Sequence, residues 1–202
     1  GKKTIIGVLG CVVQAEDEQI AKRTGYVDFA LGPLTYHRLP EVLKKVLAQT
    51  DDPIIDTEFP VESKFDFLPE NSSQGGCSFL AIQEGCNNFC TYCIVPYVRG
   101  RERSRSPRDI IEEVRTLAKQ GYKEITLLGQ NVNSYLRVER EKNIEFEEYE
   151  GVNSFATLLR AINKIDGIER IRFVSPHPKD FTLDVIEAIR DCDKICKLIH
   201  LP

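Results

Sequence analysis

The sequence predicts an α/β protein in which part of a (β/α) barrel follows part of a small parallel α/β domain. In the first third, short apolar β-branched runs alternate with helical patterns, which is typical of a parallel sheet with covering helices. From Cys77 onward, strand-helix units repeat, and such repetition predicts part of a (β/α) barrel. Between them, residues 51–76 lose periodicity and gather prolines, acids and serines. We therefore expect domains over 1–66 and 77–202, joined by a linker over 67–76.

The first domain contains a β-α-β-α pattern. Residues 4–9 and 27–31 are expected strands, and the polar stretch 14–24 between them is an expected helix. Pro40 opens a further helix, because the fixed φ of proline suits a first turn. A short strand is expected at Ile54-Ile55.

The second domain begins with a strand at 78–83 that runs directly into a cysteine loop. A helix with an apolar stripe follows, capped by Ser106, opened by Pro107 and ended by Gly121. The remaining expected elements are a strand at 124–128, a long loop to Ser154, a helix from Phe155, a strand at 170–174, a helix capped by Thr182 and a fourth strand at 197–201.

The composition is that of an ordinary globular protein and excludes several classes. The 202 residues are 42% hydrophobic and 29% charged. The sequence contains no run of eighteen apolar residues, the length that a membrane-spanning helix needs. No signal peptide is visible, so we expect a cytoplasmic protein. The chain contains no methionine and ends within an apolar run, so we expect a segment of a longer protein with incomplete sites.

The charge is unevenly distributed. The net charge of −4 argues against a surface that coats nucleic acid, yet residues 99–108 carry five arginines against the single acid Glu102. Residues 139–150 carry six glutamates. Each run can be a solvated face, but the basic one lies beside the main motif and is also a candidate functional patch.

That motif is a group of three cysteines, Cys86, Cys90 and Cys93, spaced C-x3-C-x2-C. A structural zinc site normally needs four protein ligands, and no fourth Cys or His stands at a zinc-finger spacing. A four-iron cluster fits better, because three thiolates can hold three irons and leave the fourth open to a small molecule. Buried cysteines, or zinc completed by a remote residue, are the alternatives.

At these residues the chain resembles the radical S-adenosylmethionine enzymes, whose defining loop has this spacing with an aromatic residue before the last cysteine. The resemblance implies a radical-SAM barrel whose [4Fe-4S] cluster binds S-adenosylmethionine and, once reduced by an electron donor, cleaves it to a 5′-deoxyadenosyl radical. Tyr92 matches the aromatic position, near which relatives contact the adenine.

Other segments resemble the methylthiotransferases within that family, namely Gly10-Cys11-Val12-Val13-Gln14 and the run from Cys93 to Arg105. The segment from Leu128 to Tyr135 most resembles the branch that adds a methylthio group to C2 of N6-isopentenyladenosine beside the tRNA anticodon. A methylthiotransferase for a ribosomal protein is the first alternative. A zinc-stabilised nucleic-acid-binding module is the second.

The methylthiotransferase resemblance also implies further site residues. Cys11 matches the third ligand of a second cluster, whose other two ligands would precede Gly1, so residues 1–66 would be the C-terminal part of the N-terminal methylthiotransferase domain. The remaining candidates follow strands or lie in the basic run. They are Gln130, Asn131, Ser175 and His177 for the cofactor, and Arg99, Arg101, Arg103 and Arg105 for the phosphates of the tRNA anticodon loop.

Overall fold

The structure is a computed structural model that describes residues 4–48, 52–60, 65, 76–146 and 148–201. It divides into two compact units, one of residues 1–69 with 88–100 and the other of residues 70–87 with 101–202. The predicted linker lies outside the described residues except for Gly76. The predicted domain boundaries therefore stay a prediction.

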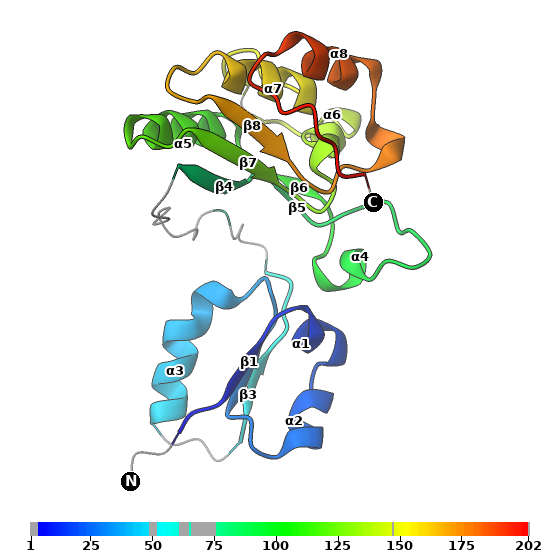
Figure 1. The fold of residues 1–202 in the computed structure, drawn as a ribbon. Helices are drawn as coiled ribbons and strands as arrows, with labels where there is room; N and C mark the ends of the chain where they lie inside the picture. The colour runs from blue at the N-terminus through cyan, green and yellow to red at the C-terminus, as the bar shows by residue number, and fades with distance from the viewer. Residues whose placement is uncertain (1–3, 49–51, 61–64, 66–75, 147, 202) are drawn as a thin grey trace. The chain divides into compact units, whose positions relative to one another are not determined.

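The first unit is built on a three-stranded parallel sheet in the order β1-β2-β3 (Figure 1). Alternate residues of β2 face opposite sides: Ala30 packs with residues of α1 and α2, whereas Phe29 and Leu31 pack with α3. The predicted parallel α/β arrangement is thus confirmed. The elements are β1 (Gly7–Leu9), α1 (Cys11–Glu16), α2 (Gln19–Thr24), β2 (Phe29–Leu31), η1 (Tyr36–Arg38), α3 (Leu39–Leu47), β3 (Ile54–Asp56) and α4 (Val95–Val98).

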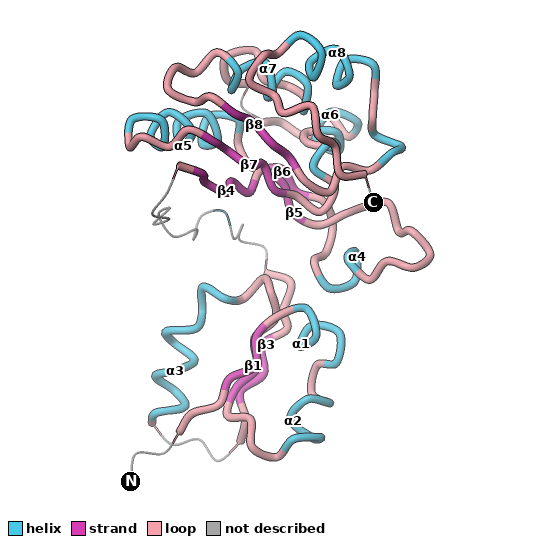
Figure 2. Tube along the Cα trace, viewed as in Figure 1, coloured by secondary structure: helices cyan, strands magenta, loops and turns pink. Residues whose placement is uncertain are grey.

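The second unit contains the parallel sheet β4-β7-β8, with α5, α7 and α8 on one side of it (Figures 1 and 2). One large core cluster joins the strands to these helices, with side chains such as Ile125, Ile110 and Leu158 fully buried. The elements are β4 (Cys77–Ala81), β5 (Gln83–Glu84), β6 (Arg103–Ser104), α5 (Pro107–Lys119), β7 (Glu124–Leu128), η3 (Val132–Ser134), α6 (Arg137–Glu141), α7 (Phe155–Asn163), β8 (Arg170–Phe173), η4 (Pro178–Asp180) and α8 (Leu183–Asp191).

Three strands each followed by a helix form an open part of a (β/α) barrel, as the sequence predicted. The predicted fourth strand at 197–201 is wrong: this segment is coil, and Ile195 makes only an isolated parallel bridge to Ile171. Leu198 is 72% exposed, so the apolar run does not enter the core of the described residues. None of the helices in the described ranges has the length and apolar character needed to cross a bilayer.

Candidate cofactor site

The cysteine loop is closed at its base by a small antiparallel pair. β5 pairs with β6 so that Gln83 lies opposite Ser104 and Glu84 opposite Arg103. The two halves of this pair lie on either side of residues 85–102, so the loop leaves and re-enters the second unit at one place. Asn87 adds a further tie, because its Oδ1 accepts a hydrogen bond from the backbone N–H of Glu102 at 3.2 Å.

The three motif cysteines form no disulfide bond in the part of the chain that the structure describes, and their environments differ. Cys86 is 8% exposed and lies in the second unit, whereas Cys90 and Cys93 are half-buried and belong to the first. The N–H of Cys93 donates to the carbonyl of Cys90 at 2.9 Å. In the described residues, no three Cys, His, Asp or Glu side chains are grouped closely enough to hold a metal ion. Ligation by these cysteines therefore remains a prediction, supported by the chemistry of the donor set.

Two glutamines fix the start of the cysteine loop to the end of β7. The side chain of Gln83, 2% exposed, donates to the carbonyl of Gly85 at 2.8 Å and accepts from the N–H groups of Gln130 at 3.1 Å and Asn131 at 3.3 Å. In return, Oε1 of Gln130 accepts from the N–H of Gly85 at 2.8 Å. The Gln130 side chain thus holds the backbone one residue before Cys86.

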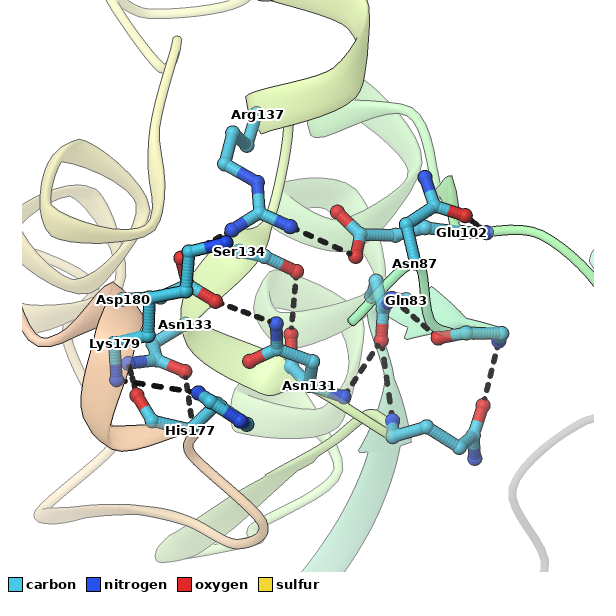
Figure 3. Close-up of polar contacts among 12 residues, drawn as sticks. Gln83, Asn87, Glu102, Asn131, Asn133, Ser134, Arg137, His177, Lys179 and Asp180 are labelled. Atoms are coloured by element: carbon cyan, nitrogen blue, oxygen red, sulfur yellow. Dashed lines mark hydrogen bonds and ion pairs between the residues drawn. The ribbon is translucent and has the colours of Figure 1, made fainter. Parts of the chain in front are cut away.

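A buried polar network continues from Asn131 to Asp180 in η4, the turn of helix that follows β8. Asn131 is 1% exposed and its Nδ2 donates to Oδ2 of Asp180 at 2.7 Å, while its Oδ1 has no hydrogen-bond partner among the described residues. Arg137 contacts Asp180 on one side and Oε2 of Glu102, at 3.5 Å, on the other (Figure 3). A buried acceptor without a partner suits a ligand that brings a hydrogen-bond donor.

Ser175 and His177 lie in the loop after β8 and act mainly through their backbones. Ser175 has a φ of 58°, and its carbonyl accepts from the N–H of Val132 at 3.2 Å. His177 exchanges two hydrogen bonds with the Asn133 amide, at 2.8 and 3.0 Å, and its Nδ1 accepts from the N–H of Lys179 at 3.1 Å. These contacts join the end of β8 to η3, which follows β7.

Glu102 is the most electrostatically unusual group near the cysteine loop. Its residue is 4% exposed, and burial raises the pKa of its carboxyl group from the usual 4.5 to about 7. The positive charge of Arg137 lowers this pKa, whereas the carboxylates of Asp180 and Glu139 raise it further. Glu102 therefore changes its charge near neutral pH.

The other predicted ligand-binding residues differ in accessibility. Tyr92 is 85% exposed, and Arg101 and Arg103 are exposed as well. Arg105 is ion-paired with Glu113 at 2.6 Å and its side chain is 11% exposed. Of the four arginines predicted to contact RNA, Arg101 and Arg103 are thus exposed, whereas Arg99 and Arg105 are half-buried.

Within the first unit, Cys11 is the first residue of α1, and only Gly10 separates it from the end of β1. Its Sγ accepts a hydrogen bond from Nε of Arg99 at 3.3 Å. Arg99 follows α4, which packs against α1. Arg99, one of the four arginines predicted to contact RNA, therefore contacts Cys11, the predicted ligand of the second cluster.

Four network residues were absent from the sequence-based site: Gln83, Glu102, Arg137 and Asp180. They lie far apart in the sequence, and no motif groups them. Glu102 alone gave a signal, as the single acid inside a run of five arginines.

These features define a class of protein. Residues 80–202 match the family model described as the Radical SAM superfamily. The chain belongs to this superfamily, which confirms the predicted resemblance. The family implies a [4Fe-4S] cluster and S-adenosylmethionine. The three cysteine side chains of the loop, and the Asn131 oxygen that has no hydrogen-bond partner among the described residues, fit those groups chemically.

More specific similarity comes from curated proteins. The chain is 48% identical over 199 residues to proteins named tRNA-2-methylthio-N(6)-dimethylallyladenosine synthase from Escherichia coli O1:K1 / APEC, Escherichia coli O139:H28 and Shigella boydii serotype 18. The matches cover 98% of this chain and 40% of each relative. The chain thus spans less than half the length of these relatives.

Solved structures support the fold alone. The radical S-adenosylmethionine methyltransferase TsrM from Kitasatospora setae, with tryptophan and an S-adenosylmethionine analogue bound, matches with a TM-score of 0.54 and 14% identity, over 98% of this chain and 49% of that one. A second TsrM structure, with cobalamin and a [4Fe-4S] cluster bound, matches with a TM-score of 0.53 and 14% identity, over 96% and 50%.

Proposed function

We propose that the protein carrying this chain is a radical SAM tRNA methylthiotransferase that modifies C2 of N6-isopentenyladenosine beside the anticodon. The observation that carries this proposal is the 48% identity, over 98% of the chain, to synthases named for that modified nucleoside. A methylthiotransferase acting on a ribosomal protein shares the cysteine loop and is the competing assignment. A tRNA-modifying enzyme works where tRNA is, so the proposal includes a cytoplasmic location.

Cys86, Cys90 and Cys93 are the proposed ligands of the [4Fe-4S] cluster. When bound, the cluster and S-adenosylmethionine supply the radical chemistry needed to replace a hydrogen on an unactivated aromatic carbon. The chain's own residues bind and orient these groups. Gln83 and Gln130 fix the backbone beside Cys86, and Oδ1 of Asn131 is positioned to accept a hydrogen bond from the cofactor.

The remaining cofactor candidates have supporting roles in this proposal. Tyr92, being exposed, is open to contact with the adenine, while Ser175 and His177 set the backbone at the end of β8. Cys11 is the proposed ligand of a second cluster in the full-length protein. The Arg99 guanidinium beside its sulfur would stabilise negative charge on the ligand set.

Arg101 and Arg103 are the proposed RNA contacts. A chain of net charge −4 does not attract nucleic acid as a whole, so binding depends on a local patch such as this one. Each phosphate contact made by an arginine adds affinity that falls with salt concentration. A single-stranded anticodon loop also allows a base to be turned into a closed site.

A competition experiment tests the assignment. The full-length protein, reconstituted anaerobically with iron and sulfide, is given S-adenosylmethionine, a low-potential electron donor and an equimolar mixture of isopentenylated tRNA and ribosomal protein. We expect the methylthio group in the tRNA digest alone, detected by mass spectrometry. Methylthiolated ribosomal protein with unmodified tRNA would overturn the proposal.

A binding experiment tests the patch separately. Arg101→Ala combined with Arg103→Ala should weaken tRNA binding and flatten its salt dependence by a slope of about two, one for each lost phosphate contact. The control is Arg190→Ala, which removes an exposed arginine from α8. Equal tRNA affinity and salt slope in the double variant and the control would remove these arginines from the proposal.

A further inference from the structure

Arg137 connects two buried carboxyl groups that come from distant parts of the second unit. It is the first residue of α6, and its side chain is 24% exposed. One nitrogen of its guanidinium group contacts Oδ1 of Asp180, and the other lies 3.5 Å from Oε2 of Glu102 (Figure 3). The carboxylate-bearing side chains are 9% and 0% exposed, respectively, so the contacts are largely shielded from water.

Each residue that carries one of these carboxyl groups is in turn tied to a segment with a proposed site residue. Oδ2 of Asp180 accepts from Nδ2 of Asn131 at 2.7 Å, which connects the guanidinium to the loop after β7. The backbone N–H of Glu102 donates to Oδ1 of Asn87, the residue after Cys86. A path of contacts therefore runs from the Asn131 amide through the Asp180, Arg137 and Glu102 side chains, and then through the backbone N–H of Glu102, to the base of the cysteine loop.

Such a path is costly to build, because every charged member gives up its hydration. Buried ion pairs of this kind often contribute little net stability, and their best-attested use is to specify one geometry. The guanidinium group suits this task, since its rigid fork can bind two carboxylates at once, whereas a lysine ammonium acts as a single point charge. The geometry, more than the net stability, accounts for an arginine at this position.

We propose that Arg137 is a positioning residue that holds the base of the cysteine loop, through Glu102 and Asn87, in a fixed place relative to Asn131 and Asp180. It touches neither cofactor nor substrate in this role. The proposal rests on the cofactor site proposed above, but it is independent of the identity of the methylthio acceptor.

Two readouts on the full-length protein test this role. In Arg137→Met, hydrogen–deuterium exchange of the amides around residues 85–102 should become faster in the protein without cofactor. In the cluster-loaded protein, the dissociation constant of S-adenosylmethionine should rise by about tenfold or more, a size typical of lost supporting contacts around a metal site. Arg137→Lys should give an exchange rate and a dissociation constant between those of the parent and those of Arg137→Met. The matched control is Arg140→Met, which removes an exposed arginine from the same helix.

A double variant separates positioning from simple charge balance. Removing Arg137 leaves the buried carboxyl groups of Glu102 and Asp180 without their shared cation. Glu102→Gln in the same chain removes the negative charge of Glu102 but does not restore the link between Glu102 and Asp180. We expect the Glu102→Gln/Arg137→Met protein to regain thermal stability while its loop amides still exchange fast and its cofactor affinity stays low. Recovery of both loop protection and affinity would overturn the proposal, as would unchanged exchange in Arg137→Met. Neither outcome depends on tRNA turnover, so failure here is distinct from failure of the proposed function.

Discussion

The buried carboxyl group of Glu102 makes a quantitative prediction about the pH dependence of stability. Its pKa rises from 4.5 to about 7 on folding, chiefly because burial disfavours the charged form. The protonated carboxyl group contributes stability that is fully present below about pH 4.5 and is lost as the pH rises through about 7. The full loss amounts to about 3 kcal/mol, since each tenfold change in acid dissociation equals about 1.4 kcal/mol.

Replacing Glu102 with Gln removes this titration and keeps the shape of the side chain. The free energy of unfolding of the variant minus that of the parent should therefore increase by about 2 kcal/mol from pH 5 to pH 8. The increase is smaller than the full loss because part of that loss already occurs below pH 5. The attraction to Arg137 is already contained in the pKa of about 7, so it does not alter this gain. Urea unfolding followed by circular dichroism, at closely spaced pH values, measures the difference directly.

The control for this prediction is Glu187→Gln, which changes an exposed glutamate on α8. The difference in unfolding free energy between this variant and the parent should stay constant from pH 5 to pH 8, because an exposed carboxylate keeps its hydration. If Glu102→Gln and its parent lose stability in parallel from pH 5 to pH 8, burial does not control this group and the reasoning fails.

Three further predictions concern packing, capping and close approach in the second unit. Leu80→Ala, at a β4 side chain that is 1% exposed, should lower the free energy of unfolding by about 3 kcal/mol in urea titrations, by lost burial and a residual cavity. Ser154→Ala removes the capping box of α7 and should cost about 1 kcal/mol in the same assay. Gly129→Ala would bring a Cβ to 2.8 Å from Oε1 of Gln83, so it should speed amide exchange at the end of β7, whereas Gly76→Ala, with nothing within 4 Å, should not.

Local pattern was sufficient for the elements that bury a regular apolar face. The strand at 124–128 was predicted with the bounds it has in the structure, and the helix opened by Pro107 begins where expected. Each has an apolar run or stripe bounded by a residue type that starts or stops it. Local chemistry and tertiary packing agree there, so single-sequence reasoning succeeds.

Elements that depend on distant partners were missed. β5 and β6 are two residues each and pair across the whole cysteine loop, so neither has a recognisable period. The helix α6, with the sequence Arg-Val-Glu-Arg-Glu, has one buried side chain and lies inside a segment predicted as loop. The run at 197–201 looked like a strand by composition, but strand formation needs a partner, and in the described residues the preceding segment makes only one bridge.

The candidate site was only partly predictable for the same reason. Gln130 and Asn131 were singled out as positions after a strand end, because parallel strands direct their C-terminal ends to one edge, and both do follow β7. Their binding of the cofactor stays a prediction. Which atoms those side chains would contact could not be predicted, since the partners Gln83 and Asp180 lie 47 and 49 residues away. A buried polar network is specified by three-dimensional packing, and its members carry no common sequence spacing.

The most direct test of the account is electron paramagnetic resonance of the reduced, anaerobically reconstituted protein, with and without S-adenosylmethionine. To isolate the loop cluster, the spectra are taken in a Cys11→Ala background, where the second cluster is expected to be lost. We predict a [4Fe-4S] signal that changes when S-adenosylmethionine is added, and loss of that signal after changing Cys86, Cys90 or Cys93 singly to Ala. Cys192→Ala, at a buried cysteine outside the loop, should leave both the signal and its response intact. A colourless protein that holds zinc, or a cluster that still responds to S-adenosylmethionine in all three loop variants, would contradict the account.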